Sequence, residues 1–224
     1  MTLIYEENAM NIVVSGAASG IGRAIAEKFL REGHSVCGID LSVSAITHPA
    51  YRHFVCDIRD EKLPELPETE ILICSAGTQE EKDAIAVNLT GTIHFAEHFR
   101  PCERLRAILF IASASARNGA EFPLYVASKA GIVGYMKNLA LAEAKRGVTV
   151  NSISPGGVIT PANRHILESE ELYRAVLDET LLGKWCEAEE IAELAYFLTV
   201  VNRSMTGEDL LIDNGEMLKS NFIW

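Results

Sequence analysis

The sequence lacks the features of a secreted or membrane-embedded protein. Its five cysteines form no C-x-x-C pair and are odd in number, which is typical of free thiols in a reducing compartment. No stretch reaches the ~18 apolar residues of a membrane span, and residues 1–8 lack a basic segment followed by an apolar one. The sequence therefore predicts a cytoplasmic protein that does not enter a membrane.

Basic charge is also scarce. The chain has 20 Lys and Arg against 31 Asp and Glu, for a formal net charge of −11, and its basic residues form no cluster. Such a molecule repels phosphate backbones, so we expect no nucleic-acid partner. No repeat, low-complexity segment or linker divides the 224 residues, of which 48% are hydrophobic. We therefore expect a single domain over residues 1–224.

Short apolar runs rich in β-branched residues recur along the chain, and helical patterns separate most of them. Near-continuous apolar runs suit strands buried on both faces of a parallel sheet. The alternation predicts the α/β class, with a doubly wound, mostly parallel sheet flanked by helices in a single Rossmann-like domain. The predicted strands cover residues 11–15, 35–40, 53–57, 71–75, 107–111, 148–153 and 210–212.

Two connections are predicted to be unusual. Residues 58–70 are polar and contain Pro64 and Pro67, which forbid a long helix there. After Gly77, the order of Thr78 and Glu81 matches a capping box and predicts a helix that starts near Gln79. Both features shorten the border of the cleft expected at the carboxyl edge of the sheet.

A glycine-rich turn joins the first predicted strand to a helix. Glycines at such a turn permit positive φ and bring a pyrophosphate close to backbone N–H groups at the helix N-terminus. Together with an acidic residue at the end of the second strand, this context predicts a dinucleotide site rather than a merely tight turn. The turn contains Gly16, Ser19, Gly20, Ile21 and Gly22.

The acidic residue is Asp40, which can accept hydrogen bonds from both hydroxyls of the adenosine ribose. A 2′-phosphate would meet its negative charge, so NAD is the expected cofactor rather than NADP. A capping role at the strand end is the alternative for Asp40. Asp57 ends the third strand and is predicted either to meet the adenine amino group or to form an Asx-turn.

Tyr125 and Lys129 stand four residues apart in a segment that opens a helix at Pro123, which stacks the two side chains on one face. A nearby ammonium lowers the pKa of a phenol, so this spacing predicts a tyrosine suited to acid–base chemistry. Ser113 follows the fifth strand and can donate to a developing oxyanion at the same edge. Taken alone, this spacing is more often that of a common surface pair.

These motifs, in this order over nearly the whole chain, resemble the short-chain dehydrogenase/reductase family in its compact, single-domain branch. The resemblance implies that Tyr125 is the general acid/base and that Ser113 orients the substrate oxygen. It further implies that Lys129 binds the nicotinamide ribose and that Asn88 holds a water linking Lys129 to solvent. The implied cofactor contacts, besides the glycine turn and Asp40, come from Asp57, Ile58, Ala76, Gly77, Tyr125, Lys129, Pro155, Val158 and Thr160.

The sequence departs from the family pattern after the fourth strand. Cys74 and Ser75 stand where the family usually has asparagines, so the backbone beside the cofactor is expected to be held differently. Ser115 lies within reach of the same edge as Ser113, and the choice between the two rests on the resemblance. His94 and His98 lie four apart, but no third ligand of suitable spacing is evident and no metal site is expected.

The sequence favours an NAD(H)-dependent oxidoreductase that interconverts a secondary alcohol and a ketone, with Tyr125 as general acid/base. The alternatives are a reductase of an activated double bond, an NAD-using isomerase and a non-catalytic NAD-binding sensor. A sensor gains nothing from the full set of Ser113, Tyr125, Lys129 and Asn88. A methyltransferase would share the glycine turn but gives no account of Tyr125 and Lys129.

The substrate is expected to be a small alcohol or ketone, bound by residues 115–122 and 163–185 and by the C-terminal residues 222–224. Residues 162–182 are predicted to form an amphipathic lid that is mobile without ligand. Arg117 and Arg164 follow the serine motif and the Thr160 turn, and the sequence leaves open whether they face an anionic substrate or solvent. A homo-oligomer, dimer or tetramer, is also expected.

Overall fold

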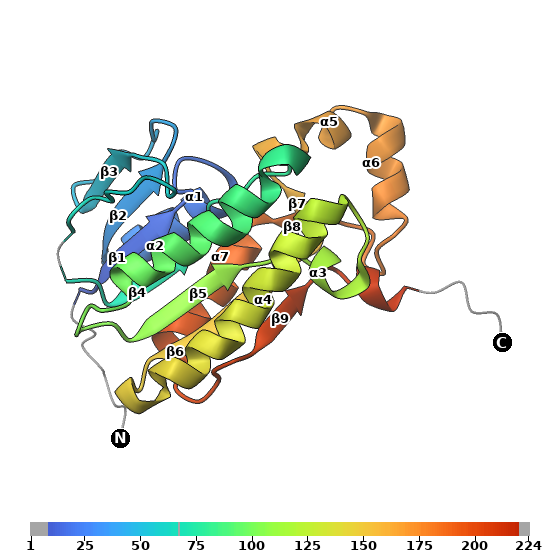
Figure 1. Cartoon of the computed structure of the whole chain (residues 1–224). Helices are drawn as coiled ribbons and strands as arrows, with labels where there is room; N and C mark the ends of the chain where they lie inside the picture. The colour runs from blue at the N-terminus through green and yellow to red at the C-terminus, as the bar shows by residue number, and fades with distance from the viewer. Residues whose placement is uncertain (1–8, 67, 220–224) are drawn as a thin grey trace, which may run out of the picture.

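The computed structural model describes residues 9–66 and 68–219. Its centre is a sheet of seven parallel strands in the order β3-β2-β1-β4-β5-β6-β9, which confirms the predicted α/β class and the doubly wound, Rossmann-like domain (Figure 1). The strands are β1 (Asn11–Ser15), β2 (Ser35–Asp40), β3 (Tyr51–Val55), β4 (Ile71–Cys74), β5 (Ala107–Ile111), β6 (Thr149–Pro155) and β9 (Asp209–Ile212).

The sheet is buried on both faces because its strands carry apolar side chains at consecutive positions. In β1, Ile12 and Val14 face one layer while Val13 faces the other, and all three are 2% exposed or less. Strand β1 pairs with β2 on one side and with β4 on the other. The strand order therefore reverses at β1, and ligands bind at such a switch point, beyond the carboxyl ends of the strands.

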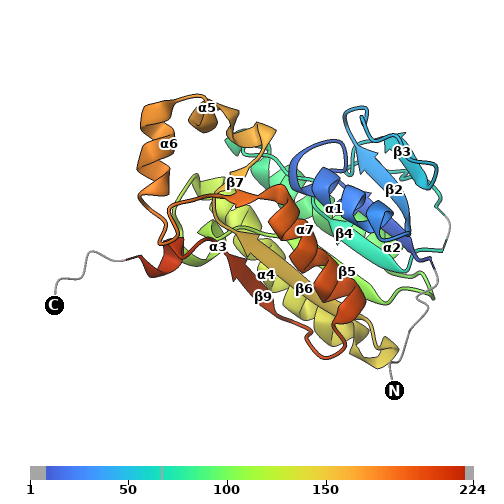
Figure 2. The ribbon, with the colours of Figure 1, turned by 180° about the vertical axis from the view of Figure 1, so that it is seen from behind.

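Helices cover both faces of the sheet (Figures 1 and 2). On one face, α1 packs against α7, and Phe29 and Ile191 belong to the core between these helices and the sheet. On the other face, α2 and α4 contribute Phe95 and Met136 to a second core. The helices are α1 (Gly20–Arg31), α2 (Thr92–Phe99), α3 (Ser115–Asn118), α4 (Pro123–Glu143), α5 (Arg164–Leu167), α6 (Glu170–Leu177) and α7 (Ala188–Tyr196).

The two connections singled out in the sequence behave differently. Within the described part of residues 58–70 there is no helix, as predicted. The predicted helix start near Gln79 is wrong: a 3-10 turn, η1 (Glu81–Asp83), comes first, and a π-helical segment, η2 (Ile85–Gly91), leads into α2. The Thr78 hydroxyl accepts a hydrogen bond from the backbone N–H of Glu80, two residues on, so it forms a local turn instead of a cap.

The segment predicted as a lid leaves the sheet as a separate excursion. A short parallel pair, β7 (Val158–Ile159) and β8 (Cys186–Glu187), joins the two ends of this excursion. Between them, the 3-10 turn η4 (Pro161–Asn163), α5 and α6 stand beyond the carboxyl edge of the sheet (Figure 1). The remaining short segments are η3 (Ala144–Arg146), the π-helical η5 (Phe197–Val201) and η6 (Glu216–Leu218).

None of the helices in the described ranges combines the length and hydrophobicity needed to cross a bilayer.

Candidate cofactor and active site

A cavity of about 960 Å³ lies along the carboxyl edge of the sheet. It is lined by every predicted site residue except Asn88, which is buried behind the wall that its neighbour Val87 contributes. The structure therefore brings together residues that the sequence separates by up to about 145 positions. Those that line the cavity are Gly16, Ser19, Gly20, Ile21, Gly22, Asp40, Asp57, Ile58, Ala76, Gly77, Ser113, Tyr125, Lys129, Pro155, Val158 and Thr160.

The glycine turn is shaped by backbone crowding. Gly16 has a φ of +72°, and a Cβ there would lie 2.8 Å from both the Cα and the backbone nitrogen of Ala76. A Cβ at Gly22 would lie 2.2 Å from the Gly16 carbonyl oxygen. Only glycine fits both positions, and α1 begins within the turn, at Gly20. The free N–H groups of the first turn of α1 thus face a cavity where a pyrophosphate fits.

The end of β4 is held by a side chain from β1. The Ser15 Oγ accepts hydrogen bonds from the backbone N–H groups of Ser75 and Ala76, at 3.0 and 3.1 Å. In this chain, a serine of the neighbouring strand therefore holds the backbone that follows β4, and the expected difference from the family stays a prediction. Ser15 is 1% exposed, so these bonds form away from water.

Asp40 lies at the end of β2, against the glycine turn. Its Oδ2 accepts a hydrogen bond from the backbone N–H of Ala18 at 3.0 Å, and its Oδ1 accepts one from that of Ser42 at 2.9 Å. Each oxygen keeps a further lone pair, and the carboxylate borders the cavity. The side chain therefore caps the local backbone and can also accept hydrogen bonds from a ligand.

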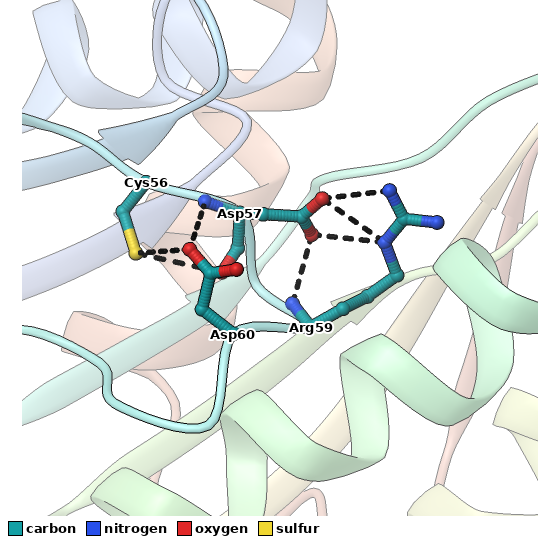
Figure 3. Close-up of polar contacts among 4 residues, drawn as sticks. All are labelled: Cys56, Asp57, Arg59 and Asp60. Carbon is teal, nitrogen blue, oxygen red and sulfur yellow. Dashed lines mark hydrogen bonds and ion pairs between the residues drawn. The ribbon is translucent and has the colours of Figure 1, made fainter.

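Asp57 forms the Asx-turn that the sequence left as an alternative, and it also pairs with Arg59 (Figure 3). The backbone N–H and the guanidinium of Arg59 both donate to its carboxylate, at 2.7 to 3.0 Å. The hydrogen bond to the guanidinium holds the pKa of the Asp57 carboxyl below its usual range. An adenine amino group at this site would share the carboxylate with Arg59, which the sequence analysis did not foresee.

Tyr125 and Lys129 lie on one face of α4, as their spacing predicts, with the Lys129 Nζ 5.7 Å from the centre of the Tyr125 ring. The Lys129 Nζ donates a hydrogen bond to the Ile111 carbonyl oxygen at 3.0 Å, at the end of β5. Burial lowers the pKa of Lys129 to about 8, because a buried ammonium is poorly solvated. The ammonium is thus fixed in position between the sheet and the cavity.

The predicted lowering of the phenol pKa is not found. Burial raises the pKa of Tyr125 to about 12, the negative charge of Glu121 adds to the rise, and a hydrogen bond with Ser113 opposes it. The expectation from spacing was wrong because it counted one nearby cation and neither the loss of hydration nor the neighbouring carboxylate. The phenol of Tyr125 therefore carries its proton at neutral pH.

Asn88 makes a closed set of hydrogen bonds within η2 and its surroundings. Its amide donates to the Thr78 carbonyl oxygen and to the Ser128 Oγ, and its Oδ1 accepts from the Thr78 backbone N–H at 2.7 Å. A Cβ at Gly77 would lie 3.2 Å from that Oδ1 and 3.4 Å from the Lys129 Nζ. Glycine thus keeps space between Asn88 and Lys129, and the water-holding role of Asn88 stays a prediction.

Ser113 and Ser115 are both buried at the start of α3 and hydrogen bonded to each other. The Ser115 Oγ donates to the Ser113 Oγ at 2.9 Å, and the Ser115 backbone N–H donates to the same oxygen at 3.2 Å. The Ser113 hydroxyl lowers the pKa of Tyr125, and Ser115 is not among the groups that shift it. This arrangement favours Ser113 as the serine nearest the acid–base group, with Ser115 behind it.

The two arginines considered as anion-binding groups are engaged elsewhere. The Arg117 guanidinium binds the Asp209 carboxylate of β9, with nitrogen–oxygen distances of 2.7 and 2.9 Å. Arg164 pairs with Glu168 on the exposed surface of α5. Neither residue lines the cavity. Arg164 faces solvent, as the alternative had it, whereas Arg117 binds a carboxylate whose side chain is only 8% exposed. Nothing in the placement of either residue favours an anionic substrate.

The sequence analysis named no individual residue at the substrate end of the cavity. Glu121, Glu179, Trp185 and Glu216 all line it. Three of them fall in the two described segments that were expected to bind the substrate, whereas Glu216 follows β9 in η6. Burial raises the pKa of the Glu216 carboxyl, and the backbone of Gly157 opposes that rise. The expected contribution of residues 222–224 lies outside the described residues.

Comparison with known proteins agrees with this geometry. Residues 70–216 match the family model described as enoyl-(acyl carrier protein) reductase. D-Threitol dehydrogenase of Mycolicibacterium smegmatis is 30% identical over 92% of this chain and 92% of its own length. The chain belongs to the short-chain dehydrogenase/reductase family. This short-chain dehydrogenase/reductase is accordingly an oxidoreductase that uses a nicotinamide cofactor.

Two further relatives of this short-chain dehydrogenase/reductase are similar over nearly their full length. Glucose 1-dehydrogenase of Gluconobacter oxydans is 28% identical over 94% of this chain and 93% of its own. A solved structure of a putative NAD(P)-dependent gluconate 5-dehydrogenase from Beutenbergia cavernae, with bound NADP, is 25% identical and covers 95% of this chain and 98% of its own. Its TM-score is 0.84.

The residues of the cavity fit a nicotinamide dinucleotide. The crowded glycine turn leaves room for a backbone-bound pyrophosphate, and Gly77 leaves the Lys129 ammonium uncovered on the side of Asn88. In the described part of the chain, no group of three or more His, Cys, Asp or Glu side chains is arranged to hold a metal ion.

Proposed function

We propose that the protein is an NAD(H)-dependent dehydrogenase that interconverts a small, uncharged secondary alcohol and the corresponding ketone, with Tyr125 as general acid/base. The observation that carries the proposal is the joint placement of Ser113, Tyr125 and Lys129 on one wall of the cavity. The glycine turn forms the other end of the same cavity. A substrate bound beside Tyr125 therefore lies within reach of a dinucleotide bound at the turn.

The chemistry divides between cofactor and protein. A bound nicotinamide ring accepts or supplies the hydride, and the positive charge of its oxidised form favours the phenolate of Tyr125. The protein provides a proton carrier in Tyr125 and a hydrogen-bond donor in Ser113 that orients the substrate oxygen. The Lys129 ammonium, fixed to the Ile111 carbonyl oxygen, is placed to bind the nicotinamide ribose.

Charge at the substrate end supports an uncharged, hydroxyl-bearing substrate. The carboxyl groups of Glu179 and Glu216 line the cavity there, whereas Arg117 and Arg164 do not. Carboxylates repel an anionic substrate and accept hydrogen bonds from hydroxyl groups. The similar proteins named for threitol and glucose act on polyhydroxylated compounds, which agrees with this proposal.

The preference for NAD over NADP rests on Asp40, whose carboxylate borders the cavity at the expected ribose position. We also propose the cytoplasm as the site of action and a homo-oligomer, dimer or tetramer, as the working form. Residues 162–182 serve as the lid over the substrate in this proposal, because Ile166 and Val176 of that segment line the cavity.

One observation favours a second candidate. The matching family model is described as an enoyl reductase, which would make this protein a reductase of an activated double bond. Such a reaction also pairs hydride transfer with proton delivery. The two candidates differ in the substrate bond that reacts, which is a carbon–oxygen bond in the first and a carbon–carbon double bond in the second.

The test is a screen of small polyols, aldoses and their ketones, read by NADH absorbance at 340 nm, with 2-enoyl thioesters as the competing set. We expect turnover of a polyol or sugar with NAD. The Tyr125→Phe variant removes one hydroxyl and should lower turnover by at least about 1,000-fold while NAD binding and the melting temperature stay near those of the wild type. Full turnover by this variant would remove Tyr125 from the mechanism, and turnover of enoyl substrates alone would favour the second candidate.

A further inference from the structure

Glu81 caps a different helix from the one that its place in the sequence suggests. Its spacing from Thr78 predicts a capping box at a helix start near Gln79, but the 3-10 turn η1 forms there. The Glu81 Oε1 instead accepts a hydrogen bond from the backbone N–H of Leu124 at 2.8 Å. Leu124 is the second residue of α4 and directly precedes Tyr125. A side chain from 43 residues earlier in the chain therefore caps the helix that carries the proposed acid–base residue.

The N-terminus of α4 has no cap of its own. Phe122 stands at the cap position, where its side chain offers no oxygen, and Pro123 follows as the first helical residue. The first N–H groups of a helix, that of Leu124 among them, have no partner within the helix. A carboxylate satisfies such a donor and interacts favourably with the positive end of the helix dipole. Glu81 thus supplies from a distant segment what a serine or an aspartate at position 122 would supply locally.

The second oxygen of the same carboxyl group is buried. Among the described residues, the Glu81 Oε2 has no hydrogen-bond partner. A buried polar atom without a partner destabilises the folded state, so solvation does not explain where this side chain lies. The N-terminus of α4 offsets that cost, because it donates to the other oxygen and carries a partial positive charge.

A second contact joins the same part of α4 to the same segment. The Ser128 Oγ donates to the Tyr125 carbonyl oxygen at 2.6 Å and accepts from the Asn88 side-chain amide at 3.2 Å. Asn88 is in turn hydrogen bonded to the backbone N–H and the carbonyl oxygen of Thr78. Residues 78–88 therefore hold α4 at two points, at the residue before Tyr125 and at the carbonyl group of Tyr125 itself.

The turn η1 lies between the cavity and the start of α4. Glu80 and Asp83 line the cavity, whereas Ala84 is fully buried. Glu81 is not one of the cavity-lining residues, and its carboxyl group binds α4 instead. A substitution at position 81 therefore changes the support of α4 and leaves the identity of every cavity-lining residue unchanged.

We propose that Glu81 is a positioning residue, which sets the place of Tyr125 in the cavity by fixing the first turn of α4 to residues 78–88. The proposal rests on the proposed function, because it needs Tyr125 as the general acid/base. Glu81 touches no reacting atom and acts through the backbone of Leu124. Its effect on the rate comes from alignment, since a displacement of about 1 Å at a catalytic group can lower a rate about 100-fold.

The first test needs no substrate. In Glu81→Ala we expect the amide hydrogens of the first turn of α4, that of Leu124 above all, to exchange faster with solvent, as measured by NMR. Glu187→Ala is the matched control, because the Glu187 side chain caps α7 in the same way, through the backbone N–H of Glu190. It should speed exchange at the start of α7 and leave α4 unchanged. Unchanged exchange at Leu124 in Glu81→Ala would show that the cap does not form, and would overturn the proposal.

The second test uses a substrate found in the screen. In Glu81→Ala we expect kcat to fall about 10-fold or more, while the NAD affinity measured by calorimetry stays within about twofold of the wild type. Glu81→Gln keeps an oxygen that can accept from the Leu124 N–H, so it should keep at least about a third of the wild-type kcat. Glu187→Ala should keep the wild-type kcat. If Glu81→Ala does not fold, Glu81→Asp, whose side chain is one carbon shorter, takes its place.

Three outcomes of the second test would contradict the positioning role. Wild-type kcat in Glu81→Ala would exclude it. Equal losses of kcat in Glu81→Ala and Glu187→Ala would assign the effect to a general loss of stability. Equal losses in Glu81→Ala and Glu81→Gln would show that the hydrogen bond to Leu124 is not what aligns the helix.

The coupling between the two contacts gives a third test. Ser128→Ala removes the contact at the Tyr125 carbonyl group. Because both contacts hold one turn, the double variant Glu81→Ala, Ser128→Ala should lose less kcat than the product of the two single losses. A loss equal to that product would show that the two side chains act independently and would contradict a shared role in placing Tyr125.

The proposed function and the positioning role fail separately. If Tyr125→Phe abolishes turnover and Glu81→Ala does not change it, the positioning role is wrong and the proposed function stands. If Tyr125→Phe retains turnover, the proposed function is wrong, and hydrogen exchange still decides whether Glu81 caps α4.

Discussion

The cofactor end and the substrate end of the cavity are built in different ways. At the cofactor end, backbone atoms of one short turn face the ligand beside the Asp40 and Asp57 carboxylates, and the neighbouring strands β1, β2 and β4 support the turn. At the substrate end they are side chains, such as those of Glu121, Trp185 and Glu216, which come from three segments far apart in the chain. A backbone cradle recognises a constant group, whereas loop side chains can be exchanged without rebuilding the sheet.

The largest effect is expected at the cofactor end, from Gly16→Ala. The new Cβ would meet the backbone of Ala76 at 2.8 Å, and the residue would also keep a positive φ. We expect the free energy of unfolding to fall by about 3 kcal/mol, from backbone strain and overpacking together, and NAD binding to weaken strongly. Urea unfolding and calorimetry measure the two effects.

Gly33→Ala is the matched control for that variant. Gly33 has a similar φ of +85°, but a Cβ there would meet nothing within 4 Å. It should cost only about 1 kcal/mol of strain and leave NAD binding unchanged. If Gly16→Ala and Gly33→Ala lost equal amounts of stability and of NAD affinity, the close approach of Gly16 to the Ala76 backbone would not be what keeps the cofactor end rigid.

A smaller effect is expected on cofactor preference, from the side chain of Asp40. NAD(H) should bind more than about tenfold more tightly than NADP(H), because a 2′-phosphate would approach the Asp40 carboxylate. Asp40→Asn removes the negative charge, while the amide oxygen can still accept the hydrogen bond from the Ala18 N–H. The difference between the affinities for NAD(H) and NADP(H) should therefore become smaller in this variant. Equal affinities of the wild type for both cofactors, by calorimetry, would contradict the prediction and point to the Arg59 guanidinium at the same end of the cavity.

The smallest effect concerns the mobility of the substrate end. The two helices within residues 162–182, α5 and α6, have no buried side chain. Few core contacts therefore stabilise the position of this segment. We expect it to gain hydrogen-exchange protection when NAD is added, while strand β5, buried throughout, stays unchanged. Equal protection with and without NAD would show that the segment is part of the rigid core.

The sequence predicted the cofactor end far better than the substrate end. Gly16, Asp40 and Tyr125 were identified because local motifs report local geometry: a turn, a strand end and a helix face. The prediction of a helix start near Gln79 was wrong for two reasons. The Thr78 hydroxyl accepts a hydrogen bond from the Glu80 backbone N–H, and the Thr78 backbone N–H donates to the side chain of Asn88, ten residues later. That contact depends on the folded chain and leaves no mark in the local pattern.

Contacts that the spacing of motif residues does not report also explain the other two corrections. The pKa of Tyr125 depends on how deeply α4 is buried and on Glu121 across a turn, neither of which spacing reveals. Arg117 was considered for the cleft because it follows Ser113 by four residues, yet its partner Asp209 lies 92 residues later. A sequence pattern gives the reach of such a side chain but not the carboxylate that it meets.

The pairing of Arg117 with Asp209 also affects the order in which the active site is completed. Asp209 accepts hydrogen bonds from Ser152 and Ser154 of β6, so one carboxylate joins α3, β6 and β9. A growing chain has all its proposed catalytic residues once Lys129 has been added. It gains the contact that fastens α3, with Ser113 just before it, only about 80 residues later. During synthesis, the chemical groups are therefore present well before the scaffold that aligns them.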